Sequence, residues 1–308
     1  MNKNKELIDE FLDYKCNIVK CSEHTIRAYK SDLVQYLEFL TKHKIKLLNS
    51  KTDDIQLYLN IIVKKNIATT SMARKLASVR SLYKYLSNNK IIPVNITKTI
   101  KSPKLPKRLP NFLSAKEIKS LLDYPYGNSI KDIRDRLILE LFYCTGIRIS
   151  ELVGIQIKDI DFFNKLIKIK GKGNKERFVI FGDSMMSILN EYINKRDINK
   201  KNNKSTFLFP GYSNNINLDT HISTRTIFSI VKKYIKKISN NEKLSPHSIR
   251  HSFATHLLDN GANIVSVKEL MGHSSLSSTQ IYTHVKIEKL KEEYKKSHPH
   301  GDKGERIR

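Results

Sequence analysis

Apolar side chains recur every three or four positions along the first ninety residues, a spacing typical of amphipathic helices. Ser22 precedes one such stripe in the manner of an N-cap. Thr52 begins a second stripe, with two aspartates in its first turn, and a third runs from about Thr70 to Leu86. No stretch of strand-like alternation interrupts these stripes. The pattern predicts an all-helical N-terminal region.

The pattern changes after residue 110. The segment Ser114–Glu117 has the form of a capping box, and a longer apolar stripe covers residues 130–144. Residues 166–170 and 177–181 instead alternate around a glycine-rich turn, which predicts a β-hairpin. Further helices are expected at residues 183–196, 224–238, 246–259, 264–271 and from 286 onward. The expected fold class is mainly α with a small antiparallel β-hairpin or sheet.

Three prolines, at positions 103, 106 and 110, separate the two regions and alternate with basic residues. Proline at this density forbids a regular helix and favours an extended segment. The sequence therefore predicts an N-terminal domain at residues 1–100, a Pro/Lys linker at 101–110 and a C-terminal domain at 111–308. Two domains joined in this way could close around a bound duplex.

The charge of the chain narrows the class of partner. Lysine and arginine number 56 against 30 aspartates and glutamates, which gives a net charge of +26. Self-repulsion of this size is best tolerated beside a polyanion, so nucleic acid is the leading partner, although a lysine-rich proteome would also make a protein basic. The third helix carries a basic face, expected to contact backbone phosphates, that consists of Arg74, Lys75, Arg80 and Lys84.

Other classes of protein are disfavoured by what the sequence lacks. Cys16, Cys21 and Cys144 are too few and too irregular for a disulfide framework, and their odd number fits a reducing cytosol. The first residues hold no apolar signal region, and no apolar run reaches the length of a membrane span. We expect a cytoplasmic protein without membrane insertion.

Residues 245–282 combine an arginine, several histidines and a tyrosine on short predicted helices. Ser245 followed by Pro246 is typical of a helix start, so His247 and Arg250 should share one face near the helix N-terminus. Unsatisfied backbone N–H groups at such a position favour an anion. The spacing therefore predicts a phosphate site.

A metal site is the competing interpretation of the same helix. His247 and His251 have the i, i+4 spacing of a zinc motif. The glutamate that should follow the first histidine is replaced by Ser248, and Arg250 would repel a cation. We therefore expect no metal, and a structural role within the helix for His251 and His256.

Two more basic residues occupy corners of the predicted fold. Arg148 follows Gly146, which suits the left-handed position that ends a helix, and Lys172 lies between two glycines at the hairpin tip. Taken alone, Arg148 could be a structural partner of Glu151, and Lys172 could be a solvated turn residue. Both become candidates for chemistry only if the fold brings them to the phosphate site.

Four segments resemble the successive catalytic boxes of the tyrosine recombinases: TGIRISEL, GKGNKER, LSPHSIRHSFATHLLDNG and LMGHSSLSSTQIYTHV. The resemblance covers nearly the whole chain and is strongest to the bacterial Xer type. It implies a two-domain architecture, with a helical core-binding domain at 1–100 and an α+β catalytic domain at 111–308 that form a clamp on DNA.

The resemblance also implies roles for individual residues. Tyr282 would be the nucleophile, attacking the scissile phosphate to give a 3′-phosphotyrosyl link and a free 5′-hydroxyl. Arg148 and Arg250 would hold the non-bridging oxygens, for which planar guanidinium groups are well suited.

Three further residues match the family pattern. Lys172 would protonate the leaving 5′-oxygen, His247 would assist proton transfer, and His273 would hydrogen-bond the phosphate. Because the covalent link conserves the energy of the phosphodiester, the resemblance implies no cofactor, neither ATP nor a metal.

The implied partners are double-stranded DNA with inverted half-sites, a homo- or hetero-tetramer of recombinases on that DNA, and an activator protein. The C-terminal helix would hold the tetramer together, with Leu290 and Tyr294 as a docking ridge. The implied function is recombination through a Holliday junction that resolves chromosome dimers at cell division. Alternatives are an integrase or invertase of a mobile element, a type IB topoisomerase and a non-catalytic DNA-binding accessory.

Overall fold

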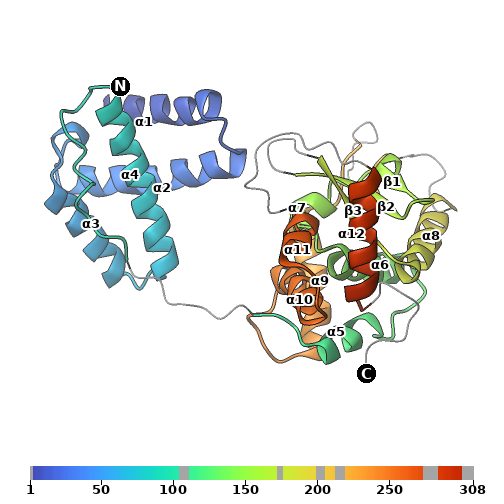
Figure 1. The fold of residues 1–308 in the computed structure, drawn as a ribbon. Coiled ribbons are helices and arrows are strands. Elements are labelled where there is room, and N and C mark those ends of the chain that lie inside the picture. Colours follow the sequence, from blue (N-terminus) through green and yellow to red (C-terminus); the bar gives the residue numbers. More distant parts are fainter. Residues whose placement is uncertain are drawn as a thin grey trace. The chain divides into compact units, whose positions relative to one another are not determined.

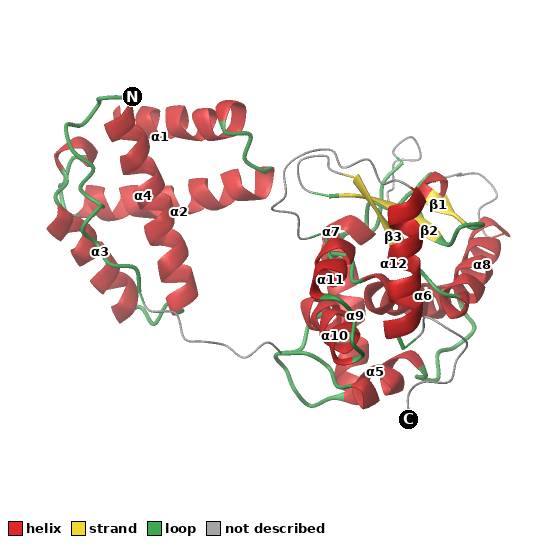
Figure 2. Cartoon of the chain, in the orientation of Figure 1, coloured by secondary structure: helices red, strands yellow, loops and turns green. Residues whose placement is uncertain are grey.

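The computed structural model of the protein describes residues 3–103, 111–171, 176–198, 205–211, 219–272 and 284–299. The chain divides into two compact units, Met1–Arg108 and Leu109–Arg308 (Figure 1). The described residues are mostly helical, and the three strands belong to the second unit (Figure 2). This confirms the predicted fold class. Residues 104–110 of the predicted linker lie outside the described residues.

The first unit consists of α1 (Lys3–Asp13), α2 (Glu23–Lys42), α3 (Thr52–Lys64) and α4 (Thr69–Asn88), with a π-helical turn at Tyr14–Ile18. The three predicted stripes are confirmed as α2, α3 and α4. The Oγ of Ser22 accepts a hydrogen bond from the backbone N of Thr25 at 3.4 Å, as expected of an N-cap. The apolar faces meet in one core, in which Leu33, Tyr36 and Val79 are fully buried.

The basic face predicted on α4 is partly wrong, because a buried carboxylate in α2 binds two of its residues and one of them, Lys75, is buried with it. Asp32 is fully buried and accepts hydrogen bonds from Arg74 at 2.5 Å, from Ser78 at 2.8 Å and from Lys75 at 3.4 Å. A carboxylate removed from water needs such partners. Lys75 is itself buried and does not face solvent, whereas Arg74 stays half exposed.

Arg80 is also engaged within the first unit. Its guanidinium donates to the carbonyl of Ile100 and to the hydroxyl of Ser102. These bonds hold residues 100–102 against α4. Lys84 remains exposed on the same helix, so the surface available to backbone phosphates is smaller than the sequence predicts.

The helices of the second unit are α5 (Ala115–Leu122), α6 (Ile130–Thr145), α7 (Ile149–Leu152), α8 (Asp183–Ile198), α9 (Thr224–Ile238), α10 (Pro246–Asp259), α11 (Ile264–Leu270) and α12 (His284–Ser297). Its antiparallel sheet has the order β1 (Ile160–Asp161), β2 (Leu166–Lys170), β3 (Glu176–Ile180). The predicted hairpin is confirmed as β2 and β3, paired from Leu166 opposite Ile180 to Lys170 opposite Glu176. The two residues of β1 are too few to show alternation, and the sequence did not predict them.

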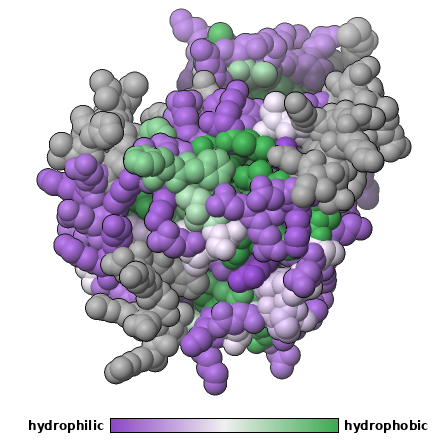
Figure 3. Space-filling view, turned by 90° about the vertical axis from the view of Figure 1, so that its right-hand side faces the viewer, coloured by the Kyte–Doolittle hydropathy of each residue, from purple (hydrophilic) through white to green (hydrophobic). Residues whose placement is uncertain are grey.

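Helix α6 is the centre of the second unit. It packs against α5, α8, α9 and α10, and every residue from Leu137 to Thr145 is buried. Hydrophilic side chains predominate on the described surface shown in Figure 3, around a smaller central group of hydrophobic ones. No helix in the described ranges is long and apolar enough to cross a bilayer.

The C-terminal helix α12 packs onto its own chain. Leu290 and Tyr294 are buried in a cluster that includes Phe253 and Leu257 of α10. The ring of Tyr294 stacks on His298 at 4.5 Å between centroids. The ridge predicted for docking on a neighbour is therefore covered by the protein itself in this structure.

Burial of an acidic side chain in α6 makes stability depend on pH. Burial raises the pKa of Glu140 to about 7, while a hydrogen bond from the thiol of Cys144 and the charge of Arg136 oppose the shift. The folded state therefore holds a proton that the unfolded chain loses above pH 4.5. Ionisation of Glu140 in the unfolded chain therefore lowers the free energy of unfolding as pH rises from 4.5 to 7. Above pH 7 this loss of stability stays constant, at roughly 3 kcal/mol at most.

We expect Glu140→Gln to raise the melting temperature at pH 8 and to leave it almost unchanged at pH 4. The exposed Glu242→Gln is the matched control and should change neither value. Calorimetry at the two pH values measures both. A stabilisation that is equal at pH 4 and pH 8 would show that folding does not raise the pKa of Glu140.

Candidate active site

The structure describes three of the six predicted catalytic residues, namely Arg148, His247 and Arg250. The other three, Lys172, His273 and Tyr282, lie outside the described residues. The geometry below therefore concerns the arginine pair, the histidine beside it and the side chains that hold them.

Arg148 is placed by a sharp corner between α6 and α7. Gly146 ends α6 with φ +57°, and a Cβ at this position would lie 2.4 Å from the ring of Phe253. Only glycine both adopts this positive φ easily and leaves room for the ring of Phe253. Arg148 then caps α7, where its backbone N donates to Glu151 Oε2 at 2.7 Å and its Nη1 donates to Oε1 at 2.9 Å. The same carboxylate thus holds the backbone and the guanidinium of Arg148.

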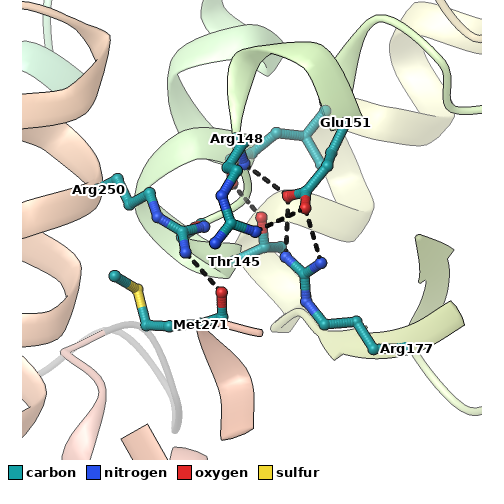
Figure 4. A network of polar contacts seen from close by, with 8 residues as sticks. Thr145, Arg148, Glu151, Arg177, Arg250 and Met271 are labelled. Carbon is teal, nitrogen blue, oxygen red and sulfur yellow. Dashed lines mark hydrogen bonds and ion pairs between the residues drawn. The ribbon is translucent and has the colours of Figure 1, made fainter. Parts of the chain in front are cut away.

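Glu151 has a second and more deeply buried partner in Arg177 of β3. The two terminal nitrogens of Arg177 donate to the two carboxylate oxygens at 2.9 Å each (Figure 4). The side chains are only 7% and 4% exposed. Burial alone would raise the pKa of Glu151, but the hydrogen bonds and charge of Arg177, with the bonds from Arg148, hold it at about 2. The carboxylate stays ionised.

Arg250 reaches the same place from α10. It is buried, and it donates to the carbonyl oxygen of Gly146 and, through Nη2 at 2.5 Å, to that of Met271. Its guanidinium lies beside that of Arg148 (Figure 4). Burial, followed by the charge of Arg148, lowers the pKa of Arg250 to about 10. The guanidinium of Arg250 remains charged at neutral pH, but the positive charge of Arg148 repels it.

His247 lies one turn before Arg250, in the first turn of α10. Pro246 is the first residue of the helix, and the backbone N of Ser245 donates to Ser248 Oγ at 3.1 Å. The side chain of His247 is exposed. The predicted helix start at Ser245 and Pro246 is confirmed.

The two other histidines of α10 differ from each other. His256 is buried, and its Nδ1 lies 3.2 Å from the hydroxyl of Tyr143 in α6, which confirms a structural role. His251 is exposed, so it does not serve the predicted structural role by packing into the core. It lies one residue after the buried Arg250, and the helical turn directs it to solvent.

The cluster carries excess positive charge. Arg148, Arg177 and Arg250 contribute three positive charges and Glu151 one negative charge, so its net charge is +2. Each guanidinium has five N–H donors, and the described hydrogen bonds of Arg148 and Arg250 use only some of them. Two adjacent guanidinium forks with spare donors are suited to the oxygens of a phosphate.

Arg177 is the site residue that sequence reasoning missed. It was counted as part of a strand, opposite the buried Ile169 in the hairpin register. Along β3 it shares its face with Val179, which is also buried. A charged residue at an inward position of an alternating strand indicates a buried ion pair. That signal was present in the sequence.

Comparison with known proteins identifies the family of the chain. The Phage integrase family matches residues 111–289, and the family described as Phage integrase, N-terminal SAM-like domain, matches residues 8–90. The chain is a tyrosine recombinase of the phage integrase family. The two family matches fall on either side of the proline-rich segment.

Relatives of this recombinase match nearly its whole length. It is 38% identical over 304 residues to the tyrosine recombinase XerC of Myxococcus xanthus, covering 97% of this chain and 99% of the relative. It is 41% identical over 305 residues to XerC of Pelotomaculum thermopropionicum, covering 95% and 97%. These matches support a site-specific DNA recombinase.

A solved structure shares the fold of the recombinase. The XerH site-specific recombinase bound to palindromic difH substrate, in a post-cleavage complex, matches with a TM-score of 0.74 and 23% identity. The match covers 94% of this chain and 95% of that chain. At this identity the likeness shows the architecture.

The corner at Gly146 gives a test of how the site is built. Gly146→Ala places a methyl group at positive φ, which should lower the free energy of unfolding by about 1 kcal/mol. The methyl group would also clash with Phe253, which should lower it by about 1–3 kcal/mol more. Gly261 is the matched control, since its φ is +87° and a Cβ there would meet nothing within 4 Å. Urea unfolding should show the larger loss for Gly146→Ala. Equal losses would mean that Phe253 does not constrain the corner.

Proposed function

We propose that this recombinase cuts and rejoins DNA at specific sites through a covalent 3′-phosphotyrosyl intermediate, with Tyr282 as the nucleophile. The observation that carries the proposal is the adjacent pair Arg148 and Arg250 within a cluster of net charge +2. A scissile phosphate would relieve the repulsion that, together with burial, lowers the pKa of Arg250. Both guanidinium groups would then bind the non-bridging oxygens.

The chemistry follows from charge development at phosphorus. The phenolic oxygen of Tyr282 forms the new bond to phosphorus while the bond to the 5′-oxygen breaks. Negative charge gathers on the non-bridging oxygens in the transition state, and fixed guanidinium groups stabilise it, an effect on the order of 10²–10³ in rate for a single donor. In the proposed roles, Lys172 protonates the leaving oxygen, His247 assists proton transfer, and His273 hydrogen-bonds the phosphate.

The reaction needs neither ATP nor a metal, because the phosphotyrosyl link conserves the energy of the broken bond. A free 5′-hydroxyl from a second strand then attacks the link and restores the tyrosine. Exchange of one pair of strands at a time gives a Holliday junction. In this account two duplexes with inverted half-sites are bound by four protomers, of one or two kinds.

The biological role that we infer is the resolution of chromosome dimers in the cytoplasm at cell division, under an activator protein. It is supported by full-length likeness to relatives named XerC. The alternative is an integrase or invertase of a mobile element with the same chemistry. We propose that the C-terminal helix links the protomers. Because Leu290 and Tyr294 are buried in their own chain, that contact requires other residues or another position of α12.

A nicked suicide duplex tests the covalent step. Cleavage releases a short oligonucleotide from such a substrate, so the protein cannot reseal it and the adduct accumulates. With a duplex selected from random DNA for tight binding, we expect the wild-type protein to form an adduct that survives denaturation. Tyr282→Phe should form none, because it lacks the attacking oxygen.

The control is Tyr14→Phe, at an exposed tyrosine of the first unit, which should form adduct at the wild-type rate. An adduct that persists in Tyr282→Phe would assign the nucleophile to another residue. No adduct with the wild-type protein would favour a non-catalytic DNA-binding accessory.

A further inference from the structure

The described residues of the site include one guanidinium that does not face the space shared by the arginine pair. Arg177 projects from an inward position of β3 and directs both terminal nitrogens to Glu151 (Figure 4). Its side chain is 7% exposed. Arg177 therefore cannot bind a phosphate without abandoning the carboxylate, and its effect on the site must pass through other residues.

The carboxylate of Glu151 is shared equally between two arginines. Oε1 accepts from Nη1 of Arg148 and from Nη1 of Arg177, and Oε2 accepts from the backbone N of Arg148 and from Nη2 of Arg177. All four bonds are 2.7 to 2.9 Å long. The bidentate pair with Arg177 fixes the plane of the carboxylate, and that plane fixes the direction of Arg148.

The same arrangement determines how much positive charge Arg148 can offer. With Glu151 alone, Arg148 would belong to a neutral pair. Arg177 adds a second positive charge to the single carboxylate, so that the three groups together carry +1. Arg148, whose side chain is 35% exposed, then keeps attraction for an incoming anion. Arg177 thus prevents Glu151 from fully neutralising Arg148, and it also fixes the orientation of the Arg148 guanidinium.

Arg177 also supports the turn that precedes His273. Gly272 has φ +65°, and a Cβ on it would lie 2.9 Å from Cζ and Nε of Arg177. The backbone of Gly272 therefore packs directly on the guanidinium. The carbonyl oxygen of the preceding residue, Met271, accepts a hydrogen bond from Arg250. The turn is held by two arginines, one from β3 and one from α10.

One donor of Arg177 is left over. Its Nε is buried and has no hydrogen-bond partner among the residues that the structure describes. A buried donor without an acceptor lowers stability. The Nε of Arg136 is buried and unpartnered in the same way among the described residues, so this donor does not distinguish Arg177 from another arginine of the second unit.

We propose that Arg177 is a positioning residue for DNA cleavage, which orients Arg148 and preserves its charge through Glu151. The proposal rests on the proposed function, because it takes Arg148 as a ligand of the scissile phosphate. It assigns no contact between Arg177 and DNA.

A double-mutant cycle with Arg148 tests the proposal. Single-turnover cleavage of the suicide duplex is measured at saturating protein for the wild type, Arg177→Lys, Arg148→Gln and the double variant. Lysine keeps the charge but cannot form two parallel bonds. We expect Arg177→Lys to lower the cleavage rate about 10- to 100-fold and to change the Kd for DNA by less than about threefold.

In the Arg148→Gln background there is no guanidinium left to position, so Arg177→Lys should lower the cleavage rate by less than about threefold. A merely structural role would instead give the same loss in both backgrounds. Equal losses, or wild-type cleavage by Arg177→Lys, would overturn the proposal.

Arg196→Lys is the matched control. Arg196 is also a buried arginine of the second unit, but it donates to the backbone carbonyls of Ser205 and Phe207, away from the site. Its substitution should lower the melting temperature, leave cleavage near the wild-type rate below that temperature, and show no coupling to Arg148. Coupling as strong as that of Arg177 would overturn the proposal.

A second variant covers the case in which Arg177→Lys does not fold. Glu151→Gln combined with Arg177→Gln removes both buried charges and leaves two amides that can bond to each other. This variant should fold and cleave at least about tenfold more slowly than the wild type, and wild-type cleavage would overturn the proposal. If the wild type forms no adduct, or Arg148→Gln cleaves normally, the proposed function fails first.

Discussion

The site depends on one buried carboxylate that must stay ionised. Glu151 is 4% exposed, and ionisation there is stable only because four hydrogen bonds converge on it from two arginines. The two arginines depend on Glu151 in turn, because neither Arg148 nor Arg177 has a second carboxylate partner among the described ion pairs. One residue therefore joins the corner before α7 to the strand β3, and with it the first and second of the catalytic boxes.

The helices supply the rigid frame around that carboxylate. The buried helix α6 ends at Gly146, whose carbonyl accepts from Arg250 and whose missing Cβ leaves room for Phe253. Both of these residues belong to α10, so the end of one helix and the face of another are placed by the same glycine. A phosphate bound by Arg148 and Arg250 would thus be held by groups from separate parts of the chain that cannot move independently.

Local signals in the sequence were sufficient for most of the elements but not for the polar contacts between distant elements. The cap at Ser22 and the left-handed Gly146 were predictable because each depends on residues within one helical turn. The bond between Arg177 and Glu151 joins positions 26 apart, and the sequence showed only that a charged residue occupied an inward strand position. Lys75 was misassigned to the surface for a similar reason, since its partner Asp32 lies on another helix.

The central claim is that Arg148 and Arg250 hold the scissile phosphate while Glu151 keeps its pair with Arg177. The most direct measurement is a structure of Tyr282→Phe bound to an uncut duplex that carries its recombination site. The account predicts that both guanidinium groups contact the same phosphate and that the Arg177–Glu151 bonds persist. A scissile phosphate bound elsewhere, with neither Arg148 nor Arg250 in contact with it, would contradict the account.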